Sequence, residues 1–385
     1  MRIPLSAPDV TEPEIEAVVT VLRSSQLSLG PKLGEFESAM AEVAGVPHAV
    51  AVSSGTAGLH LCLRVLELSE GDEVIVPSFT FIAAANAIRY VGAVPVFVDI
   101  EETCLNMSPD GIERAITPKT RAIMAVHTFG RPADMSRILA IAKRYDIVVI
   151  EDACEAIGAE FEGRRVGSFG DLAVFAFYPN KQITTGEGGV VVTRRPELAA
   201  HLRVLRNQGR SPSDDWLQHT ELGYNYRLSE INCALGLGQL QRLDEILQRR
   251  EDVARLYHRG LSGTEGLVLP AVDVPGSRIS WFVYVVRLDA SYTAVDRDLI
   301  VHELQQAGIG CGRYFGPIHL QPAYSDWRNA SVLPVTEAQA CRTIALPFFN
   351  RIEENQIVEV CSALGASMER LLAARHPSLV TNKGY

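Results

Sequence analysis

One lysine occupies an unusual position, directly after an apolar run and just before a glycine-rich turn. Lys181 lies in the segment FAFYPNKQITTGEGG, which spans residues 175–189. Partial burial of a lysine at such a place favours its neutral amine, which is both a nucleophile and a base. The alternative is a solvent-exposed lysine with an apolar stem. Lys181 is a candidate catalytic residue if other reactive groups lie beside it.

An acidic residue ends another apolar run, IVVIED at residues 147–152. Because α/β sheets bind their ligands at the carboxyl ends of parallel strands, Asp152 is placed to meet a ligand. Its carboxylate could pair with a protonated ring nitrogen of a cofactor. The alternative role is a cap for a helix that would follow.

A run of small residues, SSGTAG at 53–58, follows one strand candidate and begins a helix candidate. Backbone N–H groups at a helix N-terminus bind phosphate well, and small side chains let the anion approach. An ordinary turn of small residues is the alternative. The run matches neither GxxxxGK[ST] nor GxGxxG, which argues against nucleotide-binding loops of those two types.

Together the three features match the needs of pyridoxal 5'-phosphate. Its phosphate needs N–H donors, its pyridinium nitrogen needs a carboxylate and its aldehyde needs an amine. The turn at 53–58, Asp152 and Lys181 supply these groups. We therefore expect Lys181 to hold the cofactor as a Schiff base and then to move a proton between the substrate and cofactor carbons.

Short β-rich runs alternate with amphipathic helical runs before residue 210. The strand candidates, several of them almost wholly apolar, lie at 49–53, 73–76, 95–99, 122–126, 147–151, 172–177 and 189–193. Helix candidates lie at 32–44, 57–66, 81–90, 109–116 and 134–145, and a capping box at 11–14 begins another through residue 22. This alternation predicts an α/β fold with a mostly parallel seven-stranded sheet between helices.

The pattern changes after Ser229. A helical stretch runs to about residue 257, followed by a strand at 280–288 and helices at 294–307 and 353–364. These elements predict a smaller α+β unit. We expect a large cofactor-binding domain at 1–255, which includes the N-terminal segment, and a small C-terminal domain at 256–385.

Composition argues against several classes of protein. The 385 residues are 47% hydrophobic and 21% charged, with a net charge of −10, which disfavours nucleic acid or an anionic membrane as the main partner. No apolar run is long enough to span a bilayer, and the N-terminus does not read as a secretory signal. The seven cysteines are scattered, so neither a metal site nor a disulfide framework is predicted. A cytoplasmic enzyme fits these properties.

Six segments in order carry a resemblance to a known family: SSGTAGLH, PSFTF, VHTFGRPADM, EDACEAIGAE, FYPNKQITTGEGG and GYNYRLSEI. With them the chain resembles the DegT/StrS-type sugar aminotransferases, pyridoxal-phosphate enzymes of fold type I, from LSLGP at 27–31 to RYFGPIH at 313–319. The resemblance implies transfer of an amino group from an amino acid, glutamate in the family, to a keto-sugar. Nucleotide-linked 4-keto or 3-keto deoxyhexoses are the commonest acceptors there.

Carried over position by position, the resemblance implies further roles at the cofactor. Gly55 and Thr56 would contact the phosphate, and Phe81 would stack on the pyridine ring unless it is simply a core aromatic. Asn225 would reach the phosphate bound by the neighbouring subunit. A homodimer with shared active sites is then implied.

Three more residues are candidates for substrate contacts. Arg227 suits the carboxylate of the amino donor, with a structural salt bridge at the dimer interface as an equal alternative. His319 could contact the sugar or the nucleotide, or be an ordinary loop histidine. Glu155 stands where many members carry Gln or His, and its carboxylate could touch the incoming amine or tune the lysine linkage. Ala176 replaces a Ser or Thr of many members, which removes one phosphate contact.

Other functions stay open on the sequence. A ketocyclitol could be the acceptor in place of a sugar nucleotide. Sugar dehydratases of the same scaffold carry His at the position of Lys181, so the lysine argues against them. A non-catalytic sensor would have no need of Lys181, Asp152, Thr56 and Asn225 together. The sequence does not identify the sugar, the nucleotide or the carbon that receives the amine.

Overall fold

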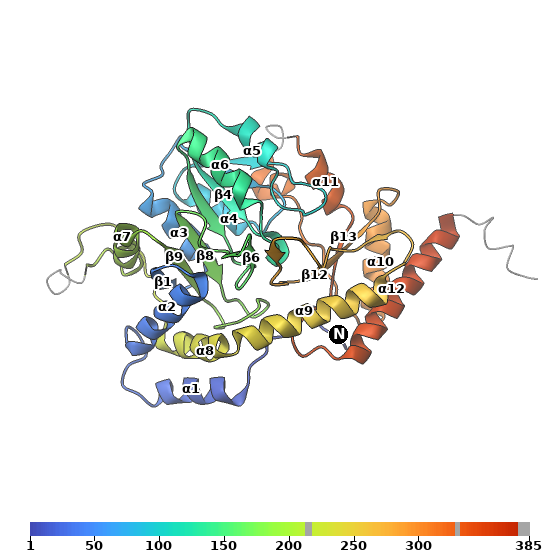
Figure 1. Cartoon of the computed structure of the whole chain (residues 1–385), viewed down its shortest axis with the longest axis horizontal. Coiled ribbons are helices and arrows are strands. Elements are labelled where there is room, and N and C mark those ends of the chain that lie inside the picture. Colours follow the sequence, from blue (N-terminus) through green and yellow to red (C-terminus); the bar gives the residue numbers. More distant parts are fainter. Residues whose placement is uncertain (212–217, 328–331, 376–385) are drawn as a thin grey trace, which may run out of the picture.

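The computed structural model describes residues 1–211, 218–327 and 332–375. Its centre is a seven-stranded sheet in the order β1-β9-β8-β5-β4-β2-β3 (Figure 1). The strands are β1 (His48–Val52), β2 (Glu73–Pro77), β3 (Val94–Val98), β4 (Thr120–Val126), β5 (Val148–Asp152), β8 (Leu172–Ala176) and β9 (Gly189–Thr193). Only β9 runs antiparallel to its neighbours in this sheet. The predicted fold class is confirmed.

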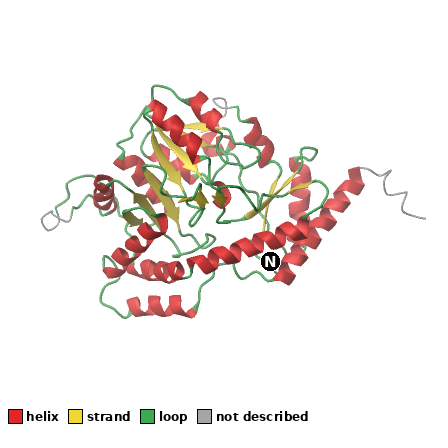
Figure 2. Cartoon of the chain, viewed as in Figure 1, coloured by secondary structure: helices red, strands yellow, loops and turns green. Residues whose placement is uncertain are grey.

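Helices cover both faces of this sheet (Figure 2). One face packs against α3 (Gly55–Val65), α4 (Ala83–Tyr90) and α7 (Pro196–Arg206). The other packs against α2 (Pro31–Ala44), α5 (Pro109–Ala115) and α6 (Met135–Tyr145). Successive strand residues alternate between the two faces, so Val74 and Val76 join one core and Ile75 joins the other. Burial on both sides explains why the central positions of these strands are mostly apolar.

The C-terminal unit is an α+β structure beside the main sheet. Its three-stranded antiparallel sheet contains β10 (Leu267–Val268), β12 (Tyr284–Leu288) and β13 (Thr343–Leu346). The helices around it are α10 (Ala294–Gln306), α11 (Pro334–Ala340) and α12 (Glu354–Arg375). A third small sheet joins β6 (Glu160–Phe161) to β7 (Arg164–Arg165) and, across the two units, to β11 (Ser277–Arg278).

Helix α1 (Glu12–Leu22) begins with the predicted capping box, in which the Thr11 backbone N–H donates to Glu14 Oε2 at 2.9 Å. It packs against α8 (Glu230–Gln241), which leads into α9 (Leu243–Leu261). Figure 1 shows α9 running from the main unit towards α12. Ile246 and Leu247 lie in the core beneath the large sheet, whereas Val253 and Tyr257 lie in the core of the C-terminal unit. The predicted boundary at residue 255 therefore falls inside one helix, and the predicted domain division stays a prediction.

Two predicted element boundaries were wrong for identifiable reasons. The helical stretch from 229 to 257 is two helices that meet at Arg242, which has non-helical backbone angles and pairs with Asp9 and Glu14. The strand predicted at 280–288 begins only at Tyr284, because Trp281 adopts a φ of 50°.

The last predicted helix is also longer than expected. It was predicted to end at residue 364, but α12 continues to Arg375 because Met368 and Leu371 extend its buried face. Residues 376–385 of the predicted C-terminal domain lie outside the described residues. Across the described ranges, no helix is both long and apolar enough to cross a membrane.

A buried arginine fastens the C-terminal unit to α9. Arg250 is 3% exposed and donates to the carbonyl oxygens of Trp281 and Phe282 at 2.7 and 2.8 Å, and to Asn350 Oδ1 at 2.7 Å. These bonds hold residues 281 and 282 out of the strand ladder. They also fix the loop that precedes β12 against the helix.

We predict that Arg250→Met destabilises the protein by about 3 kcal/mol or more, because buried acceptors lose a charged donor. The measurement is denaturant unfolding followed by circular dichroism. Arg255→Ala is the matched control on the same helix: that side chain is 39% exposed and pairs with Glu251 and Asp273, so its loss is expected to cost less than about 1 kcal/mol. Equal midpoints for the two variants would show that the Arg250 contacts contribute little.

Candidate active site

A cavity of about 620 Å³ opens at the carboxyl edge of the large sheet and is closed on one side by the C-terminal unit. Most of the predicted site residues line it: Gly55, Thr56, Phe81, Asp152, Glu155 and Lys181. They come from segments spread over more than a hundred residues of sequence. The sheet brings them together because β1, β5 and β8 all end at this edge.

The N-terminus of α3 forms one wall of the cavity. Ser54 caps the helix by accepting a hydrogen bond from the Ala57 backbone N–H at 3.1 Å. The first amides of a helix have no partner within it, so those of Gly55 and Thr56 suit a phosphate. A Cβ at Gly55 would lie 2.7 Å from the Ala176 Cβ, so only glycine fits there. We call these amides at the start of α3 the proposed anion subsite. Ala176 lies beside it, at the position where many family members carry the hydroxyl of Ser or Thr.

Asp152 ends β5 and is 8% exposed. Its Oδ1 accepts a hydrogen bond from the Cys154 backbone N–H at 3.1 Å. Residues 153–159 form turns, so the alternative role of Asp152 as a helix cap does not apply. Its carboxylate lines the cavity and is available to a protonated ring nitrogen.

The preceding acid, Glu151, has a structural role on the opposite side of the strand. Its carboxylate accepts hydrogen bonds from the backbone N–H groups of Gly167 and Gly170 and lies 3.0 Å from His127 Nε2. Burial alone would raise the pKa of Glu151, but the contacts with His127 and these amides bring it below its ordinary value. The two adjacent acids therefore differ: one is fully satisfied by the protein, and the other faces the cavity.

Lys181 lies in the loop between β8 and β9, and its side chain is only 14% exposed. Its Nζ is 3.4 Å from Glu155 Oε1 and 4.0 Å from the ring centroid of Phe282. The alternative of a surface lysine is therefore wrong. The amine is held between a carboxylate and an aromatic face, which is a position for chemistry.

Glu155 links Lys181 to the backbone of another segment. Its Oε2 accepts a hydrogen bond from the Phe129 N–H at 3.0 Å. Burial raises the pKa of the Glu155 carboxyl, and the nearby Lys181 ammonium together with the Phe129 N–H opposes that rise. The carboxyl group is thus fixed in place and close to the reactive amine.

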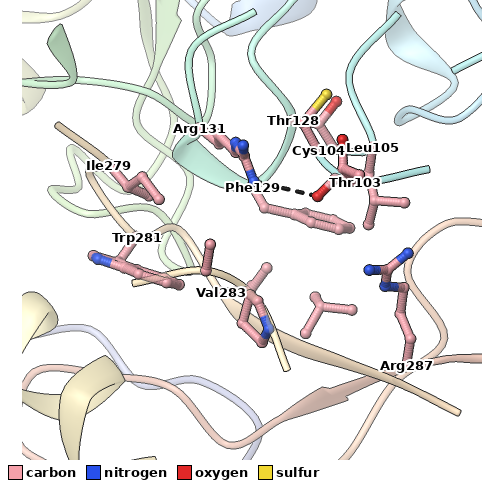
Figure 3. A pocket seen from close by; sticks show the side chains of 13 residues that line it. Thr103, Cys104, Leu105, Thr128, Phe129, Arg131, Ile279, Trp281, Val283 and Arg287 are labelled. Atoms are coloured by element: carbon pink, nitrogen blue, oxygen red, sulfur yellow. Dashed lines mark hydrogen bonds between the residues drawn. The ribbon is translucent and has the colours of Figure 1, made fainter. Parts of the chain in front are cut away.

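Phe129, whose N–H binds Glu155, belongs to the wall between the large cavity and a second, smaller one. It has a φ of 60°, and its ring stacks on Phe315 at 5.3 Å, which lines the large cavity. A second, small cavity of about 50 Å³ lies on its other side, where Arg131, Trp281 and Arg287 also line the wall (Figure 3). The sequence motif that contains Phe129 was recognised, but nothing in it marked this backbone contact with Glu155.

Phe81 lies just before α4 and is 62% exposed, with its ring on the cavity. Such exposure is incompatible with a core aromatic, and it suits a ring that stacks on a ligand. The predicted helix start at residue 81 was two residues too early. This difference leaves Phe81 free of the helix and at the opening.

Asn225 and Arg227 do not line this cavity. Asn225 is exposed and pairs through its backbone with Asn207. Arg227 donates to Asn207 Oδ1 and Gln208 Oε1, both at 3.1 Å. The alternative for Arg227, a salt bridge at the dimer interface, stays a prediction, as does its contact with the amino donor.

His319 is fully buried, away from the cavity lining. Its Nδ1 is 2.6 Å from Ser78 Oγ, and its Nε2 is 3.3 Å from Glu337 Oε1. Contact with a sugar or nucleotide does not fit this placement. The ring instead ties the short helix η2 (Ile318–Leu320) to the end of β2.

Several residues that complete the cavity were not predicted. The C-terminal unit contributes Phe282, Arg313, Tyr314 and Phe315, and the lysine loop contributes Tyr178, Asn180 and Glu187. Residues 313–315 belong to a segment that carried the family resemblance, which was the available signal. No role could be assigned to them without their position.

Comparisons with known proteins agree with this geometry. The sequence profile of the DegT/DnrJ/EryC1/StrS aminotransferase family matches residues 8–365. The GDP-perosamine synthase of Caulobacter vibrioides is 40% identical over 365 residues, which cover 94% of this chain and 97% of that protein.

Solved structures are similar over the whole chain. A proposed sugar aminotransferase of Streptococcus pneumoniae in its PMP form has a TM-score of 0.93 and 31% identity, covering 97% of this chain and 100% of that one. Its PLP form has a TM-score of 0.91, with 31% identity and 96% and 100% coverage. DesV of S. venezuelae has a TM-score of 0.88 and 37% identity, with 96% and 99% coverage.

These neighbours share a fold and a cofactor, and the cavity described above offers groups for each part of that cofactor. The protein is thus a pyridoxal-phosphate-dependent aminotransferase of fold type I, and the chain belongs to the DegT/DnrJ/EryC1/StrS aminotransferase family.

Proposed function

We propose that the protein transfers an amino group from an amino acid, L-glutamate, to a nucleotide-linked keto-sugar, as a cytoplasmic homodimer. The observation that carries the proposal is the buried contact of Lys181 with Glu155 at 3.4 Å, in a cavity that Asp152 also lines. The 40% identity to a GDP-perosamine synthase supports a nucleotide-linked sugar as the acceptor. A keto-deoxyhexose fits that comparison better than a ketocyclitol.

Bound pyridoxal phosphate supplies an electron sink for the carbon that loses or gains a proton. The amides of Gly55 and Thr56, at the start of α3, would hold its phosphate. Asp152 would keep a proton on the ring nitrogen, and Phe81 would cover a ring face. These residues would orient the cofactor relative to the amine of Lys181.

Lys181 has two roles in this proposal. Its Nζ would hold the cofactor, and the same nitrogen would then act as a base and an acid that moves one proton. Glu155 lies against this nitrogen and is itself held by the Phe129 N–H. A carboxylate there favours the protonated form of any nitrogen that it contacts.

The proposed homodimer shares its active sites. Asn225 is exposed on the surface of the chain and does not line the chain's own cavity, which is compatible with a contact to the phosphate bound by a second subunit. Arg227 lies two residues away and could bind the carboxylate of the amino donor there. Two exposed aromatic side chains at the cavity, Phe81 and Tyr178, suit a surface that another subunit covers.

The first prediction from the proposed function concerns Lys181→Ala. The purified wild-type protein with pyridoxal phosphate should show the visible absorption band of the lysine-bound cofactor, and L-glutamate should abolish that band. In the variant the band of the covalent linkage should be absent and the amino transfer at least about 10³-fold slower. Lys143→Ala, at an exposed lysine on α6, is the control and should behave as wild type. A variant that keeps the band would refute the assignment.

The second prediction concerns Glu155→Gln, which keeps the hydrogen bond from Phe129 but removes the charge. The pH at which the visible band changes should fall by about one unit, because the carboxylate no longer favours the protonated nitrogen beside it. A spectrophotometric pH titration measures this. Glu160→Gln, outside the cavity lining, should leave the midpoint in place. An unchanged midpoint with unchanged kinetics in Glu155→Gln would remove Glu155 from the mechanism.

The third prediction concerns sharing of the site between subunits. Lys181→Ala and Asn225→Ala should each be impaired alone, and mixing them under conditions of subunit exchange should restore up to about a quarter of wild-type activity, since half of the dimers then contain one intact site. The control is a mixture of Lys181→Ala with Asp152→Asn. It should recover no activity, because each site takes both Lys181 and Asp152 from one and the same subunit. Recovery in neither mixture would count against a shared site.

A further inference from the structure

The cavity contains few positive charges for the substrates proposed above. Among the described residues that line it, Lys181 and Arg313 are basic, whereas Asp152, Glu155 and Glu187 are acidic. An amino-acid donor and a sugar nucleotide both carry negative charge, and the whole chain has a net charge of −10. Because Lys181 is needed for the cofactor, Arg313 is the remaining cation of this lining that can bind a substrate anion.

The position of Arg313 is fixed by its neighbours. Its Nε forms an ion pair with Asp298 Oδ1 at 3.0 Å, and Asp298 also contacts Arg297. The preceding residue, Gly312, exchanges two backbone hydrogen bonds with Ala345 of β13, at 3.1 and 2.8 Å. The Asp298 contact engages one edge of the guanidinium, which leaves terminal nitrogens for a second anion.

The two substrate anions, the α-carboxylate of the amino donor and the diphosphate of the sugar nucleotide, are expected at different depths in the cavity. The side chain of Arg313 is 55% exposed, compared with 14% for Lys181, so the arginine lies at the opening and the lysine near the floor. In an amino acid the α-carboxylate is bonded to the carbon that bears the reacting nitrogen, which places it deep in the cavity. In a nucleotide-linked hexose the whole sugar ring separates the diphosphate from C3 or C4. An arginine at the opening therefore suits the diphosphate.

We propose that Arg313 binds the diphosphate of the nucleotide-linked keto-sugar and so helps to select nucleotide-linked acceptors. This inference rests on the proposed function and adds to it a specificity-determining residue. The rings that follow Arg313 are also held in place: Tyr314 lies parallel to Phe282 at 6.3 Å, and Phe315 stacks on Phe129. The guanidinium is therefore presented by a segment that is packed on its inner side.

The test is calorimetric titration of the pyridoxal-phosphate-loaded protein with GDP, UDP and dTDP. Arg313→Gln should weaken binding of whichever diphosphate the wild type prefers by about tenfold or more. Arg313→Lys should recover part of that loss, because it keeps the charge but not the forked donor geometry. The concentration of L-glutamate that half-saturates loss of the visible band should stay within about twofold of wild type in both variants, which also shows that they are folded.

Arg370→Gln is the matched control in the same unit. That side chain is 59% exposed and forms an ion pair with Glu303 at 2.6 Å, much like Arg313 with Asp298, but it does not line the cavity. It should change neither measurement. A raised half-saturating glutamate concentration with unchanged diphosphate binding in Arg313→Gln would assign the arginine to the donor carboxylate instead and overturn the proposal.

Two further outcomes distinguish failure of the Arg313 proposal from failure of the proposed function. Unchanged values for both ligands in Arg313→Gln would overturn any anion-binding role while leaving the proposed aminotransferase intact. A wild-type protein that loses its visible band with glutamate but binds none of the three diphosphates would overturn the nucleotide-linked acceptor itself. The role of Arg313 would then be excluded with it.

Discussion

The proposed active site depends on keeping two ionisable and largely buried side chains, Lys181 and Glu155, in contact. Burial of either charge alone would be costly, and the contact between them offsets part of that cost. The contact exists only because other groups fix each partner. Glu155 is held by the Phe129 amide, and the ammonium of Lys181 faces the ring of Phe282. A substitution that shifts the backbone at Phe129 is therefore expected to change the reaction rate through Glu155, although Phe129 itself does not contact the substrate.

The sheet supplies the geometry behind this pair. At its carboxyl edge, Gly189 at the start of β9 is registered with Val52 on one side and Ala176 on the other. This places the start of α3 directly beside the end of β8. The antiparallel direction of β9 also makes the lysine loop leave from and return to the same edge. The loop is thus anchored at both ends, which positions Lys181 opposite the anion subsite without requiring a long connection.

The parts of this site that local sequence could predict are those near strand ends. Asp152 and Lys181 follow apolar runs, and the glycine and threonine of α3 follow another, so a parallel sheet was enough to bring them together. The fold class could be predicted for a similar reason, because several of the buried strands are almost wholly apolar and alternate with helices along the chain. Family resemblance added Phe81, whose exposure at the opening is compatible with its expected role.

What could not be predicted depends on contacts between distant segments. The irregular stretch before β12 results from Arg250, whose two carbonyl partners lie 31 and 32 residues away in sequence. His319 follows the family pattern, yet its hydrogen bond to Ser78 buries it in the core. Arg313 belongs to a segment that carried the family resemblance, but its place at the opening results from the pairing of Gly312 with β13, which local sequence does not reveal.

Helix α9 contributes apolar side chains to both hydrophobic cores, and this has a consequence for how the enzyme can adapt to substrates. A continuous helix resists bending, so the C-terminal unit cannot swing far from the sheet without breaking backbone hydrogen bonds or exposing one of the two cores. The width of the cavity is consequently set in advance by the length and straightness of one helix. Acceptance of a different sugar would then evolve by substitution of side chains at the opening. The distance between the two units would stay the same.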